Sequence, residues 1–182
     1  VIDPADINGI NSYNLDIAQR RLMLWTDKVL MMSFDLQKDP DYPGLVMCLG
    51  GDMVSGDIHE ELAETNEASV MQCVLQLLDI LIEVIRQLKK EFKRIMIPCT
   101  FGNHGRKDKR IRFKRRAFSN FDWLLSCLLM KFFKDDPDIT FTVPSSTDTF
   151  FDISGRRGLL NHGDTTGARG GDGFIGALGP IM

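Results

Sequence analysis

Two short apolar runs separated by a long helical pattern constrain the fold of this chain most. The runs are LVMCL (residues 45–49) and RIMIPC (residues 94–99). Continuous apolar runs of this length are typical of strands that are buried on both faces of a sheet. Between them, residues 66–92 repeat apolar side chains at helical spacing, which predicts a long amphipathic helix. The order strand, helix, strand favours an α/β fold.

Further elements extend this pattern on both sides. Residues 11–34 and 116–133 also show helical periodicity, and Asn11 or Ser12 is available to cap the first of these helices. Its apolar residues fall on one expected face, made of Leu15, Ala18, Leu22, Trp25, Val29 and Met32. Strands are expected at 139–143, 149–153 and 158–162, with a hairpin turn in SGRRG between the last two. We therefore expect one α/β domain with a mixed sheet over residues 1–182.

Composition excludes several classes of protein. The chain is 43% hydrophobic and 26% charged, which is ordinary for a globular domain. Its longest apolar stretch, VLQLLDILIEVI, is interrupted by Asp79 and Glu83, so we expect no membrane span. No signal peptide is evident, and the four cysteines lack C-x-x-C spacing. These features favour buried, reduced thiols in a cytoplasmic protein over a disulfide or zinc framework.

Polar residues of metal-ligand type follow three of the predicted strands. They are Asp52 in CLGGDMVSGD, Asn103 and His104 in CTFGNHGR, and His162 with Asp164 in LLNHGD. Because sites in open α/β sheets lie at the carboxyl ends of the strands, these residues are expected to converge on one crevice. Each match is weak by itself, since a lone loop histidine is more often structural. Their joint occurrence favours an oxygen and imidazole site for Mn, Fe, Zn or Mg.

The motifs GGD, FGNH and NHGD, in this order and at these separations, resemble those of the calcineurin-like metallophosphoesterases. The segments VIDPADINGINSYNLDIAQRRL, GDIHEEL and NFDWLL are similar to the phage and prophage branch of that family. The resemblance covers essentially all 182 residues. It implies an α/β/β/α sandwich with mixed sheets and a centre of two divalent metal ions at the strand ends.

The resemblance also implies a role for each site residue. Asp52 matches the carboxylate that bridges both metals, and Asn103 and His162 match ligands of the second metal. His104 matches a histidine that does not bind metal but assists the leaving group. Such a centre generates a hydroxide that attacks phosphorus in line, while a positioned histidine contributes ~10²–10⁴ in rate.

The chain departs from the family pattern in three places. The opening Asp-x-His and the closing Gly-His-x-His motifs are absent, and Gly105 stands where an acidic residue often follows the Asn-His pair. The first metal would then keep Asp52 as its one protein ligand. We therefore expect a partial domain, truncated at both ends, with incomplete metal loading and weak or absent catalysis.

A basic run follows the Asn-His pair. Residues 106–116, RKDKRIRFKRR, hold eight cations and one acid, or +7, which leaves 14 cations and 24 acids, or −10, in the rest of the chain. Cations beside a metal site would attract a polyanion, and Arg106, Arg110 and Arg112 are candidates to contact substrate phosphates. The alternative is a solvated loop that leads into a helix.

Three functional hypotheses remain open on these residues. The first is a metal-dependent phosphodiesterase or nuclease acting on phosphate esters, including DNA or RNA, in phage or bacterial DNA metabolism; a phage-encoded enzyme would act in the host cytoplasm. The second is a phosphomonoesterase for protein or small-molecule substrates. The third is a nucleic-acid-binding module without turnover. In each, Asp164 either orients His162 or serves as a plain turn residue, and His59 and Asp57 are interpreted as loop residues.

Overall fold

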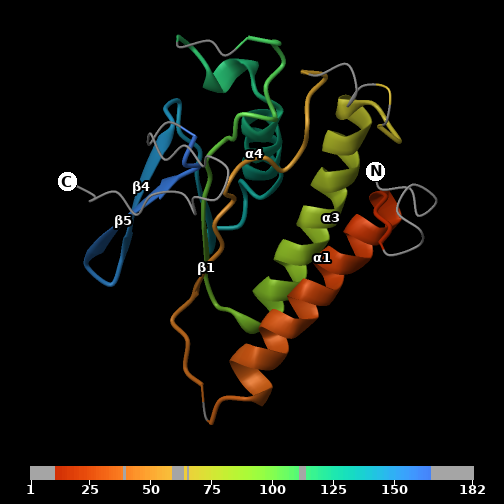
Figure 1. Cartoon of the computed structure of the whole chain (residues 1–182). Coiled ribbons are helices and arrows are strands. Elements are labelled where there is room, and N and C mark those ends of the chain that lie inside the picture. Colours follow the sequence, from red (N-terminus) through yellow and green to blue (C-terminus); the bar gives the residue numbers. More distant parts are fainter. Residues whose placement is uncertain (1–10, 39, 59–63, 65, 111–113, 165–182) are drawn as a thin grey trace, which may run out of the picture.

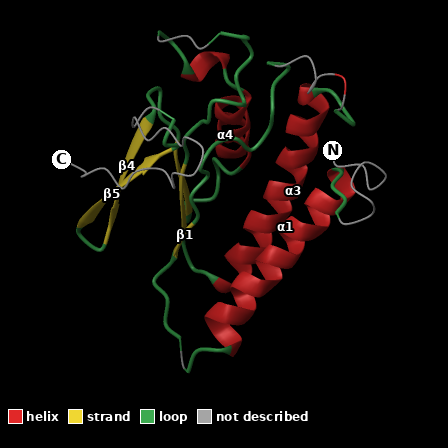
Figure 2. Cartoon of the chain, in the orientation of Figure 1, coloured by secondary structure: helices red, strands yellow, loops and turns green. Residues whose placement is uncertain are grey.

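A computed structural model describes residues 11–38, 40–58, 64, 66–110 and 114–164. In this part of the chain the fold is mixed α/β, with one parallel and one antiparallel sheet (Figures 1 and 2). The α-helices are α1 (Leu15–Leu30), α3 (Val70–Glu91) and α4 (Phe121–Phe132). A π-helical turn η2 (Met31–Asp35) and a 3-10 turn η3 (Ala117–Ser119) accompany them. The strands are β1 (Leu45–Val46), β2 (Ile95–Pro98), β3 (Ile139–Thr142), β4 (Asp148–Ile153) and β5 (Arg156–Asn161).

The parallel sheet confirms the predicted strand, helix, strand order. Its strands lie in the order β1-β2-β3, and Ile95 pairs with Leu45 on one side and with Ile139 on the other. The connections run through α3 and α4, as parallel strands require. All three carboxyl ends therefore meet at one edge of this sheet.

Helix α3 supplies much of the core. It begins at a capping box in which the Ser69 side chain accepts the Gln72 N–H, and the Gln72 side chain accepts the Ser69 N–H. Its side chains at Val84, Ile85 and Leu88 are completely buried. They join Leu125 and Leu129 of α4 and the strands β2 and β3 in one apolar cluster. The apolar face expected for residues 66–92 thus packs on the sheet as predicted.

Helix α1 differs from its prediction at the start and along its face. It begins at Leu15, with Asn14 rather than Asn11 or Ser12 as the cap, because Asn14 Oδ1 accepts the Ile17 N–H at 2.8 Å. Trp25 is 45% exposed and Met32 59% exposed, although both were placed on the apolar face. At 3.6 residues per turn, Trp25 lies roughly 80° from Leu15 around α1 and therefore sits at the edge of the stripe. Met32 belongs to the π-helical turn η2, where the α-helical spacing used for its prediction no longer holds.

The antiparallel sheet is the hairpin β4–β5. Its turn is formed by Ser154 and Gly155, which both have positive φ (49° and 77°), the conformation that two-residue hairpin loops favour. The predicted turn is therefore confirmed but shorter, since Arg156 and Arg157 already belong to β5. The hairpin lies on the opposite side of β1 from α1 and α3 (Figure 1). Thr149 Oγ1 ties it to the parallel sheet by donating to the Cys99 carbonyl at 2.5 Å.

The sequence also predicted buried, reduced cysteines and no membrane-spanning helix. All four cysteines are free. Cys99 is buried as predicted, whereas Cys73 and Cys127 are half-buried and Cys48 is exposed. Burial raises the pKa of the Cys99 thiol to about 12. Within the described ranges, no helix combines the length and the hydrophobicity needed to cross a bilayer.

Candidate functional site

The loops that follow β1 and β2 are in direct contact. A bridge between Leu49 and Cys99 extends the parallel pairing beyond the strands, and the Thr100 N–H donates to the Leu49 carbonyl at 2.9 Å. Beyond this point the two loops pack so closely that a Cβ on Gly102 would overlap Asp52 Oδ1. Gly51 adopts a φ of 84°, which favours glycine. The convergence expected from the parallel order is therefore present.

Asp52 lies at the centre of this contact. Its backbone has a φ of 53°, the left-handed region that aspartate tolerates better than most residues. Its Oδ1 accepts the His104 N–H at 2.8 Å, and its Oδ2 lies 3.0 Å from His162 Nε2. The structure thus brings together the predicted residues Asp52, His104 and His162, from three loops far apart in sequence.

His162 reaches Asp52 because the hairpin is held against the end of β2. His162 directly follows β5, whose last residue, Asn161, pairs with Asp148 at the start of β4. Thr149 is tied to Cys99, and Thr100 Oγ1 donates to the Thr147 carbonyl at 3.0 Å. These bonds place the end of β5 beside the ends of β1 and β2.

The two ring nitrogens of His162 both face oxygen acceptors. Nδ1 lies 2.8 Å from the Gly50 carbonyl oxygen, while Nε2 faces the Asp52 carboxylate. A neutral imidazole carries one N–H and one lone pair, so either tautomer leaves a lone pair directed at an oxygen. The arrangement becomes attractive at both nitrogens when the ring is doubly protonated, or when a cation lies between Nε2 and the carboxylate. A backbone carbonyl on the second nitrogen is the usual partner of a metal-binding histidine.

The donor set fits a divalent cation. Ligand bonds of about 2.1 Å at right angles place two donor atoms roughly 3 Å apart, and His162 Nε2 and Asp52 Oδ2 are 3.0 Å apart. Asn103 belongs to the adjoining loop, where its backbone carbonyl accepts a hydrogen bond from Arg106. Among the described residues there is no cluster of three or more His, Cys, Asp or Glu side chains suited to a metal. The fit therefore rests on the side chains of His162 and Asp52, and Asn103 as a ligand stays a prediction.

Asp122, near the start of α4, is a site residue that the sequence reasoning did not single out. Its carboxylate accepts four backbone N–H groups, those of Asp52 (2.9 Å), Met53 (3.0 Å), Val54 (3.3 Å) and Gly102 (3.0 Å). Its side chain is nearly inaccessible, at 1% exposure. One carboxylate therefore joins the loop that carries Asp52 to the loop that carries Asn103 and His104.

Asn120 completes this brace. Its Nδ2 donates to the Gly102 carbonyl at 2.8 Å, and its Oδ1 accepts the Asp122 N–H at 2.8 Å, so it also caps α4. The brace also leaves no room for a side chain at position 105, where an acidic residue was expected after the Asn-His pair. A Cβ on Gly105 would lie 2.7 Å from Asp122 Oδ2. The available sequence signal was the Asn-Phe-Asp start of a helix, but cap residues are common, and burial is not visible in a sequence.

Two opposing effects act on the ionisation of Asp122. Burial raises the pKa of this carboxyl, and the backbone N–H groups of Gly102, Asp52, Val54 and Met53 work against that rise. The net direction is upward. Within the described part of the chain, the groups that bind this carboxylate are backbone N–H groups, so peptide dipoles stabilise its charge.

The remaining predicted residues lie around this centre. Asp164 forms an ion pair with Arg116, whereas both His162 nitrogens contact other groups, so the expected orienting contact of Asp164 on His162 is not formed. Arg116 also lies over the Phe101 ring, 5.7 Å from its centroid. Within the basic run, Arg106 donates to the carbonyls of Asn103, Asp108 (3.0 Å) and Lys109 (3.2 Å).

The Arg106 contacts assign that guanidinium to bracing its own loop. Arg110 is exposed to solvent. The predicted substrate residue Arg112 lies outside the described residues, as does His59. The basic run as a substrate contact therefore stays a prediction.

Comparison with known proteins gives no relative: the chain matches no family model, no curated protein and no solved structure.

Proposed function

We propose that this chain is a metal-dependent phosphoesterase domain that hydrolyses phosphodiesters. The observation that carries the proposal is the position of the His162 ring between the Gly50 carbonyl and the Asp52 carboxylate. That geometry favours a cation at Nε2. Further support comes from the next loop, because the His104 backbone N–H donates to the same carboxylate.

Each residue of the proposed site has a defined task. Asp52, His162 and Asn103 would hold a divalent cation, which supplies Lewis-acid polarisation of phosphate oxygens and a nucleophilic hydroxide at neutral pH. His104, whose backbone N–H binds Asp52, would use its imidazole to donate a proton to the leaving oxygen. Asp122 holds both loops in place by their backbone, so the ligands need little rearrangement when a cation binds.

We also propose the α/β/β/α sandwich of the metallophosphoesterases as the complete architecture. A helical layer, a parallel sheet and a second sheet on its other side are the layers that support it (Figure 2). A second divalent cation would add charge stabilisation at the phosphate, and Asp52 is the residue expected to hold it. Turnover is expected to be weak, because a single carboxylate holds such a cation loosely.

The test compares the two described histidines. Mn²⁺ binding is measured by titration calorimetry for the wild type, Asp52→Asn, His162→Ala and His104→Ala. Hydrolysis of bis(p-nitrophenyl) phosphate and of p-nitrophenyl phosphate is measured on the same samples. We expect Asp52→Asn and His162→Ala to weaken Mn²⁺ binding by more than about tenfold, because each removes a ligand. His104→Ala should keep the affinity within twofold and lose ~10²–10⁴ in rate.

Each alternative has its own outcome. Unchanged Mn²⁺ affinity in both Asp52→Asn and His162→Ala would refute the site. Faster hydrolysis of the monoester than of the diester would favour the phosphomonoesterase. Salt-sensitive DNA binding without metal binding would favour the nucleic-acid-binding module.

A further inference from the structure

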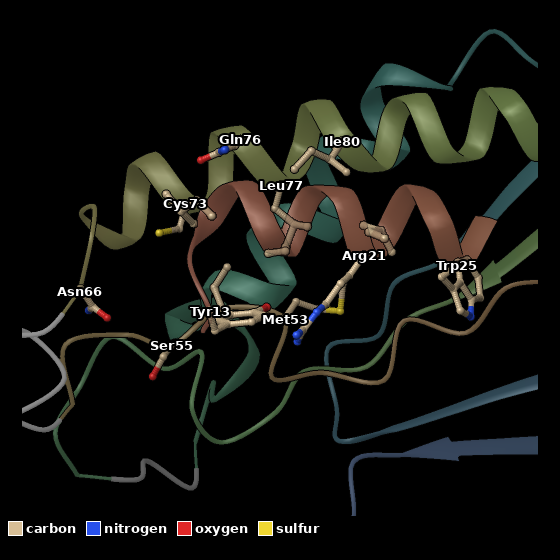
Figure 3. A pocket seen from close by; sticks show the side chains of 14 residues that line it. Tyr13, Arg21, Trp25, Met53, Ser55, Asn66, Cys73, Gln76, Leu77 and Ile80 are labelled. Atoms are coloured by element: carbon tan, nitrogen blue, oxygen red, sulfur yellow. The ribbon is translucent and has the colours of Figure 1, made fainter. Parts of the chain in front are cut away.

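A groove of about 480 Å³ lies between α1, α3 and the loop that follows Asp52 (Figure 3). Its volume falls in the range of small-molecule sites, ~300–1,000 Å³. Tyr13, Arg21 and Met53 lie close together on one side, Ser55 and Asn66 lie toward one end, and Trp25 lies at the other end (Figure 3). None of these residues belongs to the proposed metal site.

The chemistry of the lining is that of a site for a planar group with a polar edge. Its floor is aliphatic, and two exposed aromatic rings, Tyr13 (39% exposed) and Trp25 (45%), offer flat surfaces for stacking. The Arg21 guanidinium lies over the Tyr13 ring, 5.5 Å from its centroid, and adds a positive charge. The amides of Asn66 and Gln76 supply donors and acceptors.

One polar atom of the lining is unsatisfied. Ser55 Oγ is buried and finds no hydrogen-bond partner within the described part of the chain. Because this oxygen has almost no accessible surface, it offers a ligand in the groove no hydrogen bond as it lies. The polar contacts that the groove offers are therefore those of Arg21, Asn66 and Gln76.

The groove adjoins the proposed metal site through a single loop. Met53, Val54 and Ser55, which line it, are the three residues directly after Asp52. The N–H groups of Met53 and Val54 bind the same Asp122 carboxylate as the Asp52 N–H. The loop that carries Asp52 therefore also forms part of the wall of the groove.

We propose that this groove binds the nucleobase of a nucleotide substrate, so that the substrate class is a nucleotide phosphodiester. The inference rests on the proposed function for its chemistry, since it places the base one loop away from the scissile phosphate. A purely apolar ligand would leave Arg21, Asn66 and Gln76 without partners. A base stacks on aromatic rings, presents a hydrogen-bonding edge and carries an anionic phosphate, and therefore uses all three kinds of lining group.

The test measures binding without metal, in a Trp123→Phe background where Trp25 is the one remaining tryptophan. The probes are adenosine 5′-monophosphate, phenyl phosphate, which has a ring but no polar edge, and ribose 5-phosphate, which has no ring. Affinities are measured by titration calorimetry and by quenching of Trp25 fluorescence. We expect the adenosine nucleotide to bind at least tenfold more tightly than phenyl phosphate, and ribose 5-phosphate to bind more weakly still.

Matched variants locate the binding. Ala18→Met fills the groove and is expected to weaken nucleotide binding by at least tenfold. Gln19→Met introduces the same side chain one position away, on a surface that faces a different hollow, and should change the affinity by less than twofold. Arg21→Gln should reduce the preference for the nucleotide over adenosine.

The result separates this inference from the proposed function. Asp52→Asn should abolish hydrolysis and leave nucleotide binding within twofold. Base-dependent binding in a protein whose Mn²⁺ affinity is the same for the wild type, Asp52→Asn and His162→Ala would support the groove and refute the proposed metal site. Equal affinities for the adenosine nucleotide and ribose 5-phosphate, or an equal effect of Ala18→Met and Gln19→Met, would overturn the groove whether or not the esterase is active.

Discussion

Replacing Asp122 by asparagine tests the brace between the two loops. Asparagine has nearly the same shape, but it replaces one carboxylate oxygen by an NH₂ group that cannot accept a hydrogen bond. In the wild type, Oδ2 accepts the N–H groups of Asp52 and Gly102, and Oδ1 accepts those of Met53 and Val54. Whichever way the amide turns, two backbone N–H groups at this brace lose their acceptor.

The magnitude follows from these lost bonds. A donor left unpaired in a buried position costs about 1–3 kcal/mol, so two cost about 2–6 kcal/mol. Part of this is returned, because the amide carries no charge and burial disfavours the charge of Asp122. The expected loss in the free energy of unfolding is therefore about 2–4 kcal/mol, a large fraction of the ~5–15 kcal/mol of a typical domain.

Urea unfolding followed by far-ultraviolet circular dichroism measures this loss. Asp79→Asn is the control, because Asp79 is exposed on α3, and its change should stay within ~0.5 kcal/mol. The slope of free energy against urea should be the same in all three proteins, which shows that the surface exposed on unfolding is unchanged. A loss of less than 0.5 kcal/mol for Asp122→Asn would refute the reasoning, because the relief of charge burial would then equal the cost of the lost bonds.

Two further predictions concern the same loops. Burial raises the pKa of Asp122 in the folded state, so the folded state binds the proton of this carboxyl more strongly than the unfolded chain does. The wild type should therefore lose stability relative to Asp122→Asn as the pH rises from about 4 through the folded-state pKa. Unfolding measurements at several pH values test this, and the opposite slope would mean that the four N–H groups outweigh burial. Gly102→Ala should lower the free energy of unfolding by about 1–3 kcal/mol and remove any Mn²⁺-dependent rise in melting temperature, because the new Cβ overlaps Asp52 Oδ1. Gly50→Ala is the control, because its Cβ meets open space and should change neither the free energy of unfolding nor the melting temperature. Equal effects of the two substitutions would contradict the close packing of the loops.

The spacing of apolar residues predicted helices and strands well where the buried side chains are the ones that recur at helical or strand spacing. The face of α3 and the strands β2 and β3 are examples, because each is apolar over its whole buried surface. The start of α1 was wrong because three polar residues, Asn11, Ser12 and Asn14, can each cap a helix, and only tertiary packing selects among them. The prediction that Trp25 is buried was wrong, because a side chain at the edge of an apolar stripe is buried only where a neighbouring element covers it.

Part of the candidate site was predictable from the sequence. Asp52 and Asn103 follow β1 and β2, and the rule that parallel strands share a carboxyl end brings these two loops together. His162 follows β5 of the antiparallel hairpin, and it reaches Asp52 through the bonds of Thr149 and Thr100 that hold the hairpin against the end of β2. Asp122 follows no such rule, since it lies at a helix start and acts on backbone groups 20 and 70 residues away. An N–H group has no residue identity, so a carboxylate that binds only N–H groups leaves no complementary residue type in the sequence.

The choice of backbone donors has a consequence for charge at the site. A cationic partner for Asp122 would place a positive side chain beside Asp52 and oppose a metal ion there. Four N–H dipoles stabilise the buried carboxylate and bring no net charge, so the pair Asp52 and Asp122 keeps its negative potential for a cation. Arg106 and Arg116 instead have their own acceptors, Arg106 in its loop carbonyls and Arg116 in Asp164. Neither guanidinium therefore neutralises the oxygen cluster that is proposed to hold a metal ion.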